Sequence, residues 1–167
     1  FLKDQATAPD LLLMEWKAID DRHALMDVPA MWLAIYQWYE VAEQHPVIDS
    51  LLLFQRRSSP RFDQLESVRR NQHDIHDFLE IPVSDRPMII KCSLHLNFWG
   101  QLAKIFFRIP EITLDIIGSA GQRTYRVIPD TLENGLFINF LPFSLQDIKT
   151  LCKDDRALTR IYGVRFS

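Results

Sequence analysis

The sequence predicts an α+β fold, with a mainly helical segment over residues 1–80 and an antiparallel, β-sandwich-like (jelly-roll-like) part over residues 81–167. Two patterns predict this division. Before residue 80, apolar residues recur mostly at helical spacing, whereas after it they alternate with polar residues in short runs separated by turns. With 167 residues, the two parts can form separate domains or one compact unit with a substantial core.

The composition is that of a folded domain and excludes several classes of protein. Hydrophobic residues make up 47% and charged residues 25% of the chain, which is typical of globular domains and not of disordered ones. The net charge of -3 leaves no basic excess, so we expect no nucleic-acid partner. The longest strictly apolar stretch, residues 30–36, has seven residues, whereas a membrane-spanning helix needs about 20.

Three stretches have apolar residues at helical spacing and predict helices: residues 10–25, 30–44 and 62–79. Pro9 and Asp10 can start and cap the first helix. Asp27 is the expected N-cap of the second, with Pro29 in its first turn, and Pro46 ends it. Between the second and third helices, residues 47–54 predict a strand and residues 56–60 a polar loop.

The second part predicts strands at residues 90–98, 112–116, 124–128, 136–141 and 161–166. Within the first of these, alternation places Cys92 on an apolar face. Residues 118–121 and the pair Asn134-Gly135 are expected turns. Residues 102–107 fit either a short helix or a strand. Ser144 and Asp147 have the spacing of a capping pair for a helix that runs to about residue 151.

The chain has two cysteines, Cys92 and Cys152, sixty residues apart. This spacing fits neither a CxxC redox pair nor a zinc site. Because Cys92 lies on the apolar face of the predicted strand, we interpret it as a buried free thiol. In an oxidising compartment, a Cys92–Cys152 disulfide is the alternative.

A metal site is conceivable only at His73 and His76, whose spacing of three places two imidazoles on one face of the predicted helix. A zinc or iron site needs further ligands, and no matching acid or histidine stands out elsewhere. A solvated helix face therefore explains the pair better, and we expect no cofactor. The sequence also lacks a GxSxG nucleophile elbow and a glycine-rich phosphate loop.

Aromatic residues form the stripe Trp32, Tyr36 and Tyr39, with the i, i+4, i+7 spacing of one helix face. Such stripes usually belong to the core. Exposed rings of this kind instead form sugar-binding faces or membrane-interface helices, so these three residues are also candidate ligand-binding residues. Trp99, next to a glycine at the end of a predicted strand, is the best single candidate for stacking on a sugar.

Four stretches carry a family resemblance: residues 62–65 (FDQL) with 71–72 (NQ), 98–102 (FWGQL), 125–129 (YRVIP) and 133–139 (ENGLFIN). Through them, residues 47–167 resemble a soluble region of uncharacterised bacterial polytopic membrane proteins, some of them similar to glycosyltransferases of the dolichyl-phosphate-mannose mannosyltransferase type. The resemblance implies a β-rich extracytoplasmic domain that follows membrane helices lying outside this chain. It assigns no catalytic acid to any residue here.

We therefore expect a non-catalytic domain of a larger membrane protein, on the extracytoplasmic (periplasmic) face of a bacterial membrane. It would bind or position a glycan, a lipid-linked sugar or a protein partner. The start at Phe1 and the end within a predicted strand fit a piece of a longer chain. One alternative is a small soluble metal-dependent enzyme using His73 and His76. Another is a cytoplasmic protein-interaction module that docks a partner through the aromatic helix.

Overall fold

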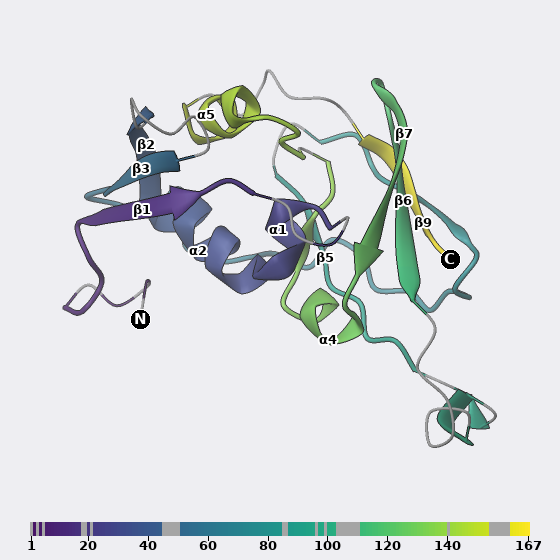
Figure 1. Ribbon diagram of the computed structural model, residues 1–167. Coiled ribbons are helices and arrows are strands. Elements are labelled where there is room, and N and C mark those ends of the chain that lie inside the picture. Colours follow the sequence, from purple (N-terminus) through teal and green to yellow (C-terminus); the bar gives the residue numbers. More distant parts are fainter. Residues whose placement is uncertain are drawn as a thin grey trace.

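The computed structural model describes residues 2, 4, 6–17, 20, 22–44, 51–84, 87–95, 97, 98, 100–102, 111–139, 141–153 and 161–167. Its strands are β1 (Leu11–Glu15), β2 (Tyr39–Gln44), β3 (Leu51–Arg56), β4 (Phe78–Glu80), β5 (Ile89–Ile90), β6 (Ile112–Gly118), β7 (Gly121–Val127), β8 (Leu136–Phe137) and β9 (Ile161–Phe166). Its helices are α1 (Ala24–Asp27), α2 (Pro29–Trp38), α4 (Pro129–Leu132) and α5 (Leu145–Lys153) (Figure 1).

One end of the molecule holds an antiparallel sheet of three strands in the order β1-β3-β2 (Figure 1). Side chains alternate across β3, where Leu52 and Phe54 are fully buried while Leu51 and Leu53 are half-buried on the opposite face. The buried side of this sheet faces α2 and α5. The alternation follows from the period of two in a strand with one face on the core.

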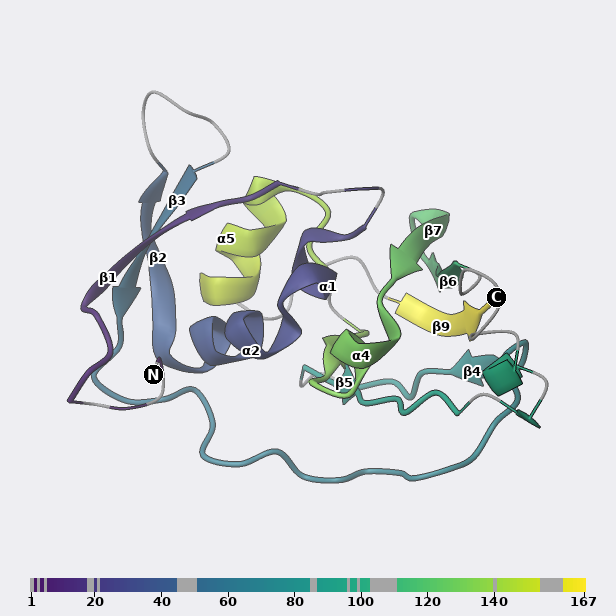
Figure 2. The same cartoon turned by 60° about the horizontal axis from the view of Figure 1, so that its bottom comes forward.

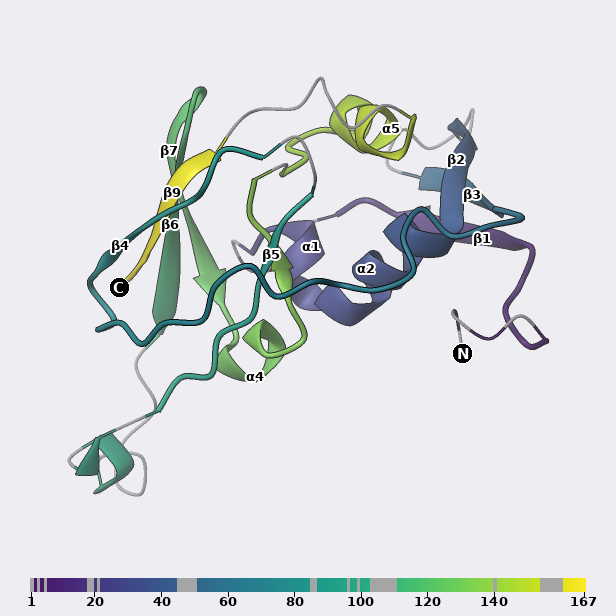
Figure 3. The ribbon, with the colours of Figure 1, turned by 180° about the vertical axis from the view of Figure 1, so that it is seen from behind.

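At the other end, four antiparallel strands form a second sheet in the order β4-β9-β6-β7, with β4 beside β9 (Figure 3). Strands β6 and β7 form the hairpin that the sequence predicts, and Gly121 at the turn has a φ of +99°, which a side chain would disfavour. The inner face of this sheet carries Leu114, Ile116 and Val164, all buried. A third sheet contains only β5 and β8.

A single hydrophobic core joins the two halves of the chain. Its centre lies where α2, α5, β3 and β8 meet around a void of only about 10 Å³, barely the size of one water molecule. There the Trp32 ring contacts Phe54 edge to face, with centroids 6.2 Å apart, and Tyr36 contacts Phe137 at 5.5 Å. Residues before and after position 80 thus bury one another's apolar surface.

The mixed α+β class is confirmed, whereas the sandwich-like second part and the mainly helical first part are not. Three of the elements before residue 57 are strands, and the sheets do not form one face-to-face pair. The predicted helix over residues 10–25 is wrong, because Leu11–Glu15 pairs with β3 as a strand. The helix predicted over residues 30–44 is right only in its first part: α2 ends at Trp38, Tyr39–Gln44 is strand β2, and the N-cap is Val28 rather than Asp27.

The helix predicted over residues 62–79 is also wrong. Residues 57–77 instead run as an extended segment along the outside of the molecule, from β3 to β4 (Figure 2). Its start is fixed to α2, where the Gln37 side chain donates to the Phe62 carbonyl at 2.7 Å. Beyond that point Leu65, Val68 and Ile75 are exposed. A helix here would have no surface against which to bury its apolar side.

Several predictions from the second part are confirmed. The strand at the C-terminal end exists as β9, and Asn134-Gly135 forms a turn before β8. Helix α5 has the predicted capping pair, in which the Asp147 N–H donates to the Ser144 hydroxyl at 3.1 Å and the Ser144 N–H donates to the Asp147 carboxylate at 3.0 Å. Of residues 102–107, where the sequence left helix and strand open, residues 103–107 lie outside the described residues.

Among the described residues of the alternating stretch 90–98, only Ile90 lies in a strand, β5. Burial still alternates from Lys91 to His95, with Cys92 and Leu94 half-buried. Cys92 is a free thiol, and burial raises its pKa to about 11. The side chain of Cys152 lies outside the described residues. No described helix has the length and apolar character needed to cross a membrane.

Candidate functional site

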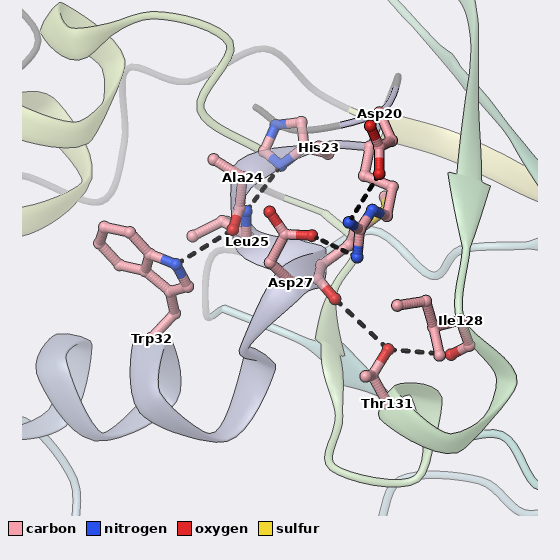
Figure 4. Close-up of polar contacts among 10 residues, drawn as sticks. Asp20, His23, Ala24, Leu25, Asp27, Trp32, Ile128 and Thr131 are labelled. Carbon is pink, nitrogen blue, oxygen red and sulfur yellow. Dashed lines mark hydrogen bonds and ion pairs between the residues drawn. The ribbon is translucent and has the colours of Figure 1, made fainter. Parts of the chain in front are cut away.

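The three aromatic residues of the predicted stripe all lie in the core. Trp32, Tyr36 and Tyr39 are 5%, 4% and 0% exposed. The Trp32 indole donates to the Ala24 carbonyl at 3.1 Å (Figure 4), and the Tyr39 hydroxyl donates to the Pro9 carbonyl at 2.9 Å. The three rings, Trp32 and Tyr36 from α2 and Tyr39 from β2, are therefore core side chains and are not presented on the surface.

The two histidines considered as metal ligands lie in the extended segment and are exposed. The Nδ1 atom of His73 is 3.6 Å from the Asp77 carboxylate. Residues 73–77 do not form a helix, so helical spacing does not bring the His73 and His76 rings to one face. Across the described residues, no three side chains of His, Cys, Asp or Glu gather in a metal-binding group. Trp99, the candidate for sugar stacking, lies outside the described residues.

A different group of polar side chains gathers on the outer face of the four-stranded sheet. Alternation along β6 turns Thr113 and Asp115 to this face, opposite the buried Leu114. The strand register then places Thr124 of β7 and Arg165 of β9 directly beside Asp115. We call Thr113, Asp115, Thr124 and Arg165 the polar row.

Asp115 is the centre of the polar row. Its carboxylate accepts a hydrogen bond from the Thr124 hydroxyl at 2.7 Å and one from the Arg165 guanidinium at 2.9 Å. These contacts, the Thr124 bond first, lower the pKa of Asp115. The side chain is nearly covered by its partners, with the residue 6% exposed. Asp115 is therefore an ionised group that fixes the positions of two more exposed neighbours.

An open cleft of about 440 Å³ lies beside the polar row. It is lined by hydroxyl, carboxylate and guanidinium groups, from Asp20, Glu111, Thr113, Thr124 and Arg126. The Arg126 guanidinium lies 3.4 Å from the Glu111 carboxylate, and both side chains are well exposed. The cleft thus offers both hydrogen-bond donors and acceptors, and the oppositely charged Arg126 and Glu111 hold one another in place.

One rim of the cleft comes from the segment before α1 (Figure 4). Asp20 has a φ of 52°, in the left-handed region that aspartate tolerates better than most residues. Its carboxylate lies 3.5 Å from the Arg22 guanidinium, which also contacts the Asp27 carboxylate at 2.8 Å. Helix α1 is in turn bound to α4, where the Thr131 hydroxyl donates to the Met26 carbonyl. Arg22 thus links the Asp20 carboxylate to that of Asp27 at the end of α1.

An exposed aromatic ring extends the polar row at its other end. Phe78 of β4 lies directly beside Arg165 in the register, and its residue is 52% exposed. The tip of its ring occupies the space above Gly163, where a Cβ atom would lie 2.0 Å from the ring. Glycine at position 163 thus makes room for Phe78 on the same face as Arg165 and Asp115.

The imidazole of His23, behind the rim, is a structural group. It is 4% exposed, and Leu25 N–H donates to its Nδ1 at 3.2 Å, so Nε2 carries the proton and donates to the Pro142 carbonyl at 2.8 Å. The rings of Tyr125 and Phe143 contact it edge to face. Burial lowers the pKa of His23 to about 4, so it is neutral near pH 7.

Sequence analysis did not single out the polar row or the cleft. The available signal was Asp115, an acid between apolar residues of a predicted strand, but its partner Arg165 is fifty positions away and only the register joins them. Comparisons of the chain with protein-family models, curated proteins and solved structures gave no match.

Proposed function

We propose that this chain is a non-catalytic extracytoplasmic domain of a larger bacterial membrane protein, and that it binds a glycan on the outer face of the four-stranded sheet. The observation that carries the glycan part is the open polar cleft beside the polar row and the exposed Phe78 ring. Sugar hydroxyls both donate and accept hydrogen bonds, while the C–H faces of sugar rings pack on aromatic side chains.

The groups of the cleft match that chemistry in kind and in placement. The Thr124 hydroxyl donates its proton to Asp115 and the Thr113 hydroxyl donates to the Ser167 carbonyl, so both offer acceptor lone pairs to a ligand. Glu111 offers further acceptors, and Arg126 offers a planar set of donors. Asp115 holds the Thr124 and Arg165 side chains in place by accepting hydrogen bonds from them at 2.7 and 2.9 Å, which reduces the entropy lost when a ligand binds.

The same groups support binding rather than catalysis. The lowered pKa of Asp115 makes it a poor general acid near neutral pH, and its oxygens are already engaged by Thr124 and Arg165. The two carboxylates of the cleft lining each lie beside a guanidinium group, Glu111 at 3.4 Å from Arg126 and Asp20 at 3.5 Å from Arg22.

The membrane part of the proposal rests on the resemblance of four sequence stretches. Its test is to read the full open reading frame around this segment for apolar stretches of about 20 residues. Several such stretches before Phe1 would support the placement, and a frame without one would overturn it. This result leaves the glycan part untouched.

The glycan part is tested first on a glycan array, and then by calorimetric titration with the best glycan found. Arg126→Gln removes the charged donor set, and Phe78→Ala removes the ring. We expect each to weaken binding by about tenfold or more, a change of ~1.4 kcal/mol. Gln55→Ala, exposed on β3 at the other end of the molecule, is the matched control and should bind normally.

Circular dichroism should show the same fold for all three variants. Two results would overturn the glycan proposal: no glycan bound by the wild-type chain, or a bound glycan whose affinity is unchanged in both Arg126→Gln and Phe78→Ala.

A further inference from the structure

The extended segment on the outside of the molecule is anchored at both of its ends (Figure 2). At its start, the Arg61 N–H donates to the Gln37 carbonyl at 2.9 Å, and the Gln37 side chain donates to the Phe62 carbonyl at 2.7 Å. At its end, Phe78–Glu80 pairs with β9 as strand β4. All fifteen residues between these anchors, 63–77, are exposed. The body of the protein therefore holds the two ends of the segment and leaves its middle in solvent.

The backbone in the middle of the segment is not paired either. Among the described residues, no backbone group of residues 64–73 bonds to another backbone group. An endoprotease binds its substrate as an extended strand, through the same N–H and C=O groups that pair in a sheet. Exposed segments without such pairing are where folded proteins are nicked. Residues 64–73 therefore meet this requirement without local unfolding.

A pair of arginines lies in the middle of the segment. Arg69 and Arg70 are both exposed, and no acidic residue lies between Glu66 and Asp74. In the orientation of the Asn71 amide that satisfies both of its polar atoms, its oxygen accepts from the Arg69 guanidinium at 2.6 Å and its nitrogen donates to the Arg70 carbonyl at 2.7 Å. These contacts are local and exposed, so breaking them costs little. Neighbouring side chains of an extended strand point in opposite directions, so two acidic pockets can bind the two guanidinium groups separately.

The chain has one other pair of adjacent basic residues, Arg56 and Arg57, and the fold protects it. The Arg56 guanidinium lies over the Trp38 ring, 5.3 Å from its centroid, and donates to the Leu2 carbonyl at 3.2 Å. The Arg57 N–H donates to the Trp38 carbonyl at 2.8 Å, and its guanidinium lies 2.8 Å from the Glu40 carboxylate. The same two side chains thus occur twice in the sequence, once held by the fold and once in the exposed segment.

The two parts of the chain on either side of Arg70 contact one another independently of the segment between them. The three-stranded sheet contains only strands that precede it, and the other two sheets contain only strands that follow it. A cut after Arg70 therefore breaks no strand pairing. Across the cut, the Tyr36 ring contacts the Phe137 ring at 5.5 Å, and the Thr131 hydroxyl donates to the Met26 carbonyl at 3.3 Å.

We propose that the Arg69-Arg70 pair is a processing site, at which an endoprotease specific for paired basic residues hydrolyses the Arg70–Asn71 bond. The hydroxyl of a water molecule bonds to the Arg70 carbonyl carbon and its hydrogen to the Asn71 nitrogen as the C–N bond breaks. The product is a folded molecule of two chains, residues 1–70 and 71–167, joined through the common core. The inference does not depend on glycan binding.

Limited proteolysis of the whole folded chain tests the site. With an endoprotease specific for paired basic residues, the masses of the fragments should show a cut after Arg70 before any cut after Arg57. Arg70→Gln should slow this cut on the order of 100-fold or more, because the acidic pocket is left without its cation. Arg57→Gln, at the protected pair, is the matched control and should be cut at the wild-type rate. A first cut after Arg57, or an Arg70→Gln variant cut as fast as the wild-type chain, would overturn the proposal.

Two further measurements separate a built-in site from a cut that follows unfolding. Urea below the unfolding transition should not speed the cut, once the protease's activity on a short peptide in the same urea is taken into account, because the segment needs no opening. The two fragments should elute together in size-exclusion chromatography and keep the circular dichroism of the uncut chain. A rate that rises with urea, or fragments that separate or unfold, would contradict the proposal.

Discussion

Acid should destabilise this protein well before its carboxylates titrate, because of His23. Its Nδ1 accepts the Leu25 N–H that caps α1, and its Nε2 donates to the Pro142 carbonyl, so the folded structure holds the neutral ring. Protonation would place a second proton on Nδ1, directed at the Leu25 N–H. The nearby Arg123 further disfavours the charged ring.

The magnitude follows from the two pKa values. Burial lowers the pKa of His23 from 6.5 to about 4 in the folded chain. Because the folded pKa is depressed, this contribution is fully present above pH 6.5 and is lost as the pH falls toward 4. The loss amounts to roughly 2 kcal/mol between pH 7.5 and pH 5 and to ~3 kcal/mol below pH 4.

The assay is urea unfolding followed by tryptophan fluorescence at pH 7.5, 6.5, 5.5 and 5.0. His23→Asn is the informative variant, since asparagine is a good N-cap and can still accept the Leu25 N–H but has no proton to gain. It should be less stable at pH 7.5 and lose most of the pH dependence. His73→Gln, on the exposed segment, should keep the wild-type slope. A wild-type chain with constant stability over this range, or an equal slope in His23→Asn, would refute the reasoning.

Three further predictions concern packing, capping and thiol reactivity. Gly163→Ala places a methyl group 2.0 Å from the Phe78 ring, and it should lower the free energy of unfolding by about 1–3 kcal/mol. Most of that loss should disappear in a Phe78→Ala background. An equal loss in both backgrounds would show that the Phe78 ring is not what opposes the methyl group. Ser144→Ala removes the capping hydroxyl of α5 and should cost ~1 kcal/mol in urea unfolding; an unchanged midpoint refutes that role. With Cys152 replaced by serine, Cys92 should react with a thiol reagent at pH 8 roughly 100-fold more slowly in the folded than in the unfolded chain, because burial raises its pKa to about 11; similar rates would show that the thiol is accessible.

Local signals predicted the parts of this fold that depend on neighbours in sequence. The β6–β7 hairpin combines alternation with a glycine turn, and the Ser144–Asp147 capping pair spans one helical turn. Both are complete within a few residues, so the sequence alone specifies them. Their prediction required no knowledge of the rest of the chain.

The elements that sequence reasoning missed depend on distant partners. Leu11–Glu15 has good helix formers, but pairing with β3 some forty residues later makes it a strand. Residues 62–79 have helical spacing, yet no surface covers Leu65 or Val68, so the spacing predicts a helix that tertiary structure does not support. Sequence reasoning missed the polar row for the same reason, because only the strand register brings Asp115 next to Arg165.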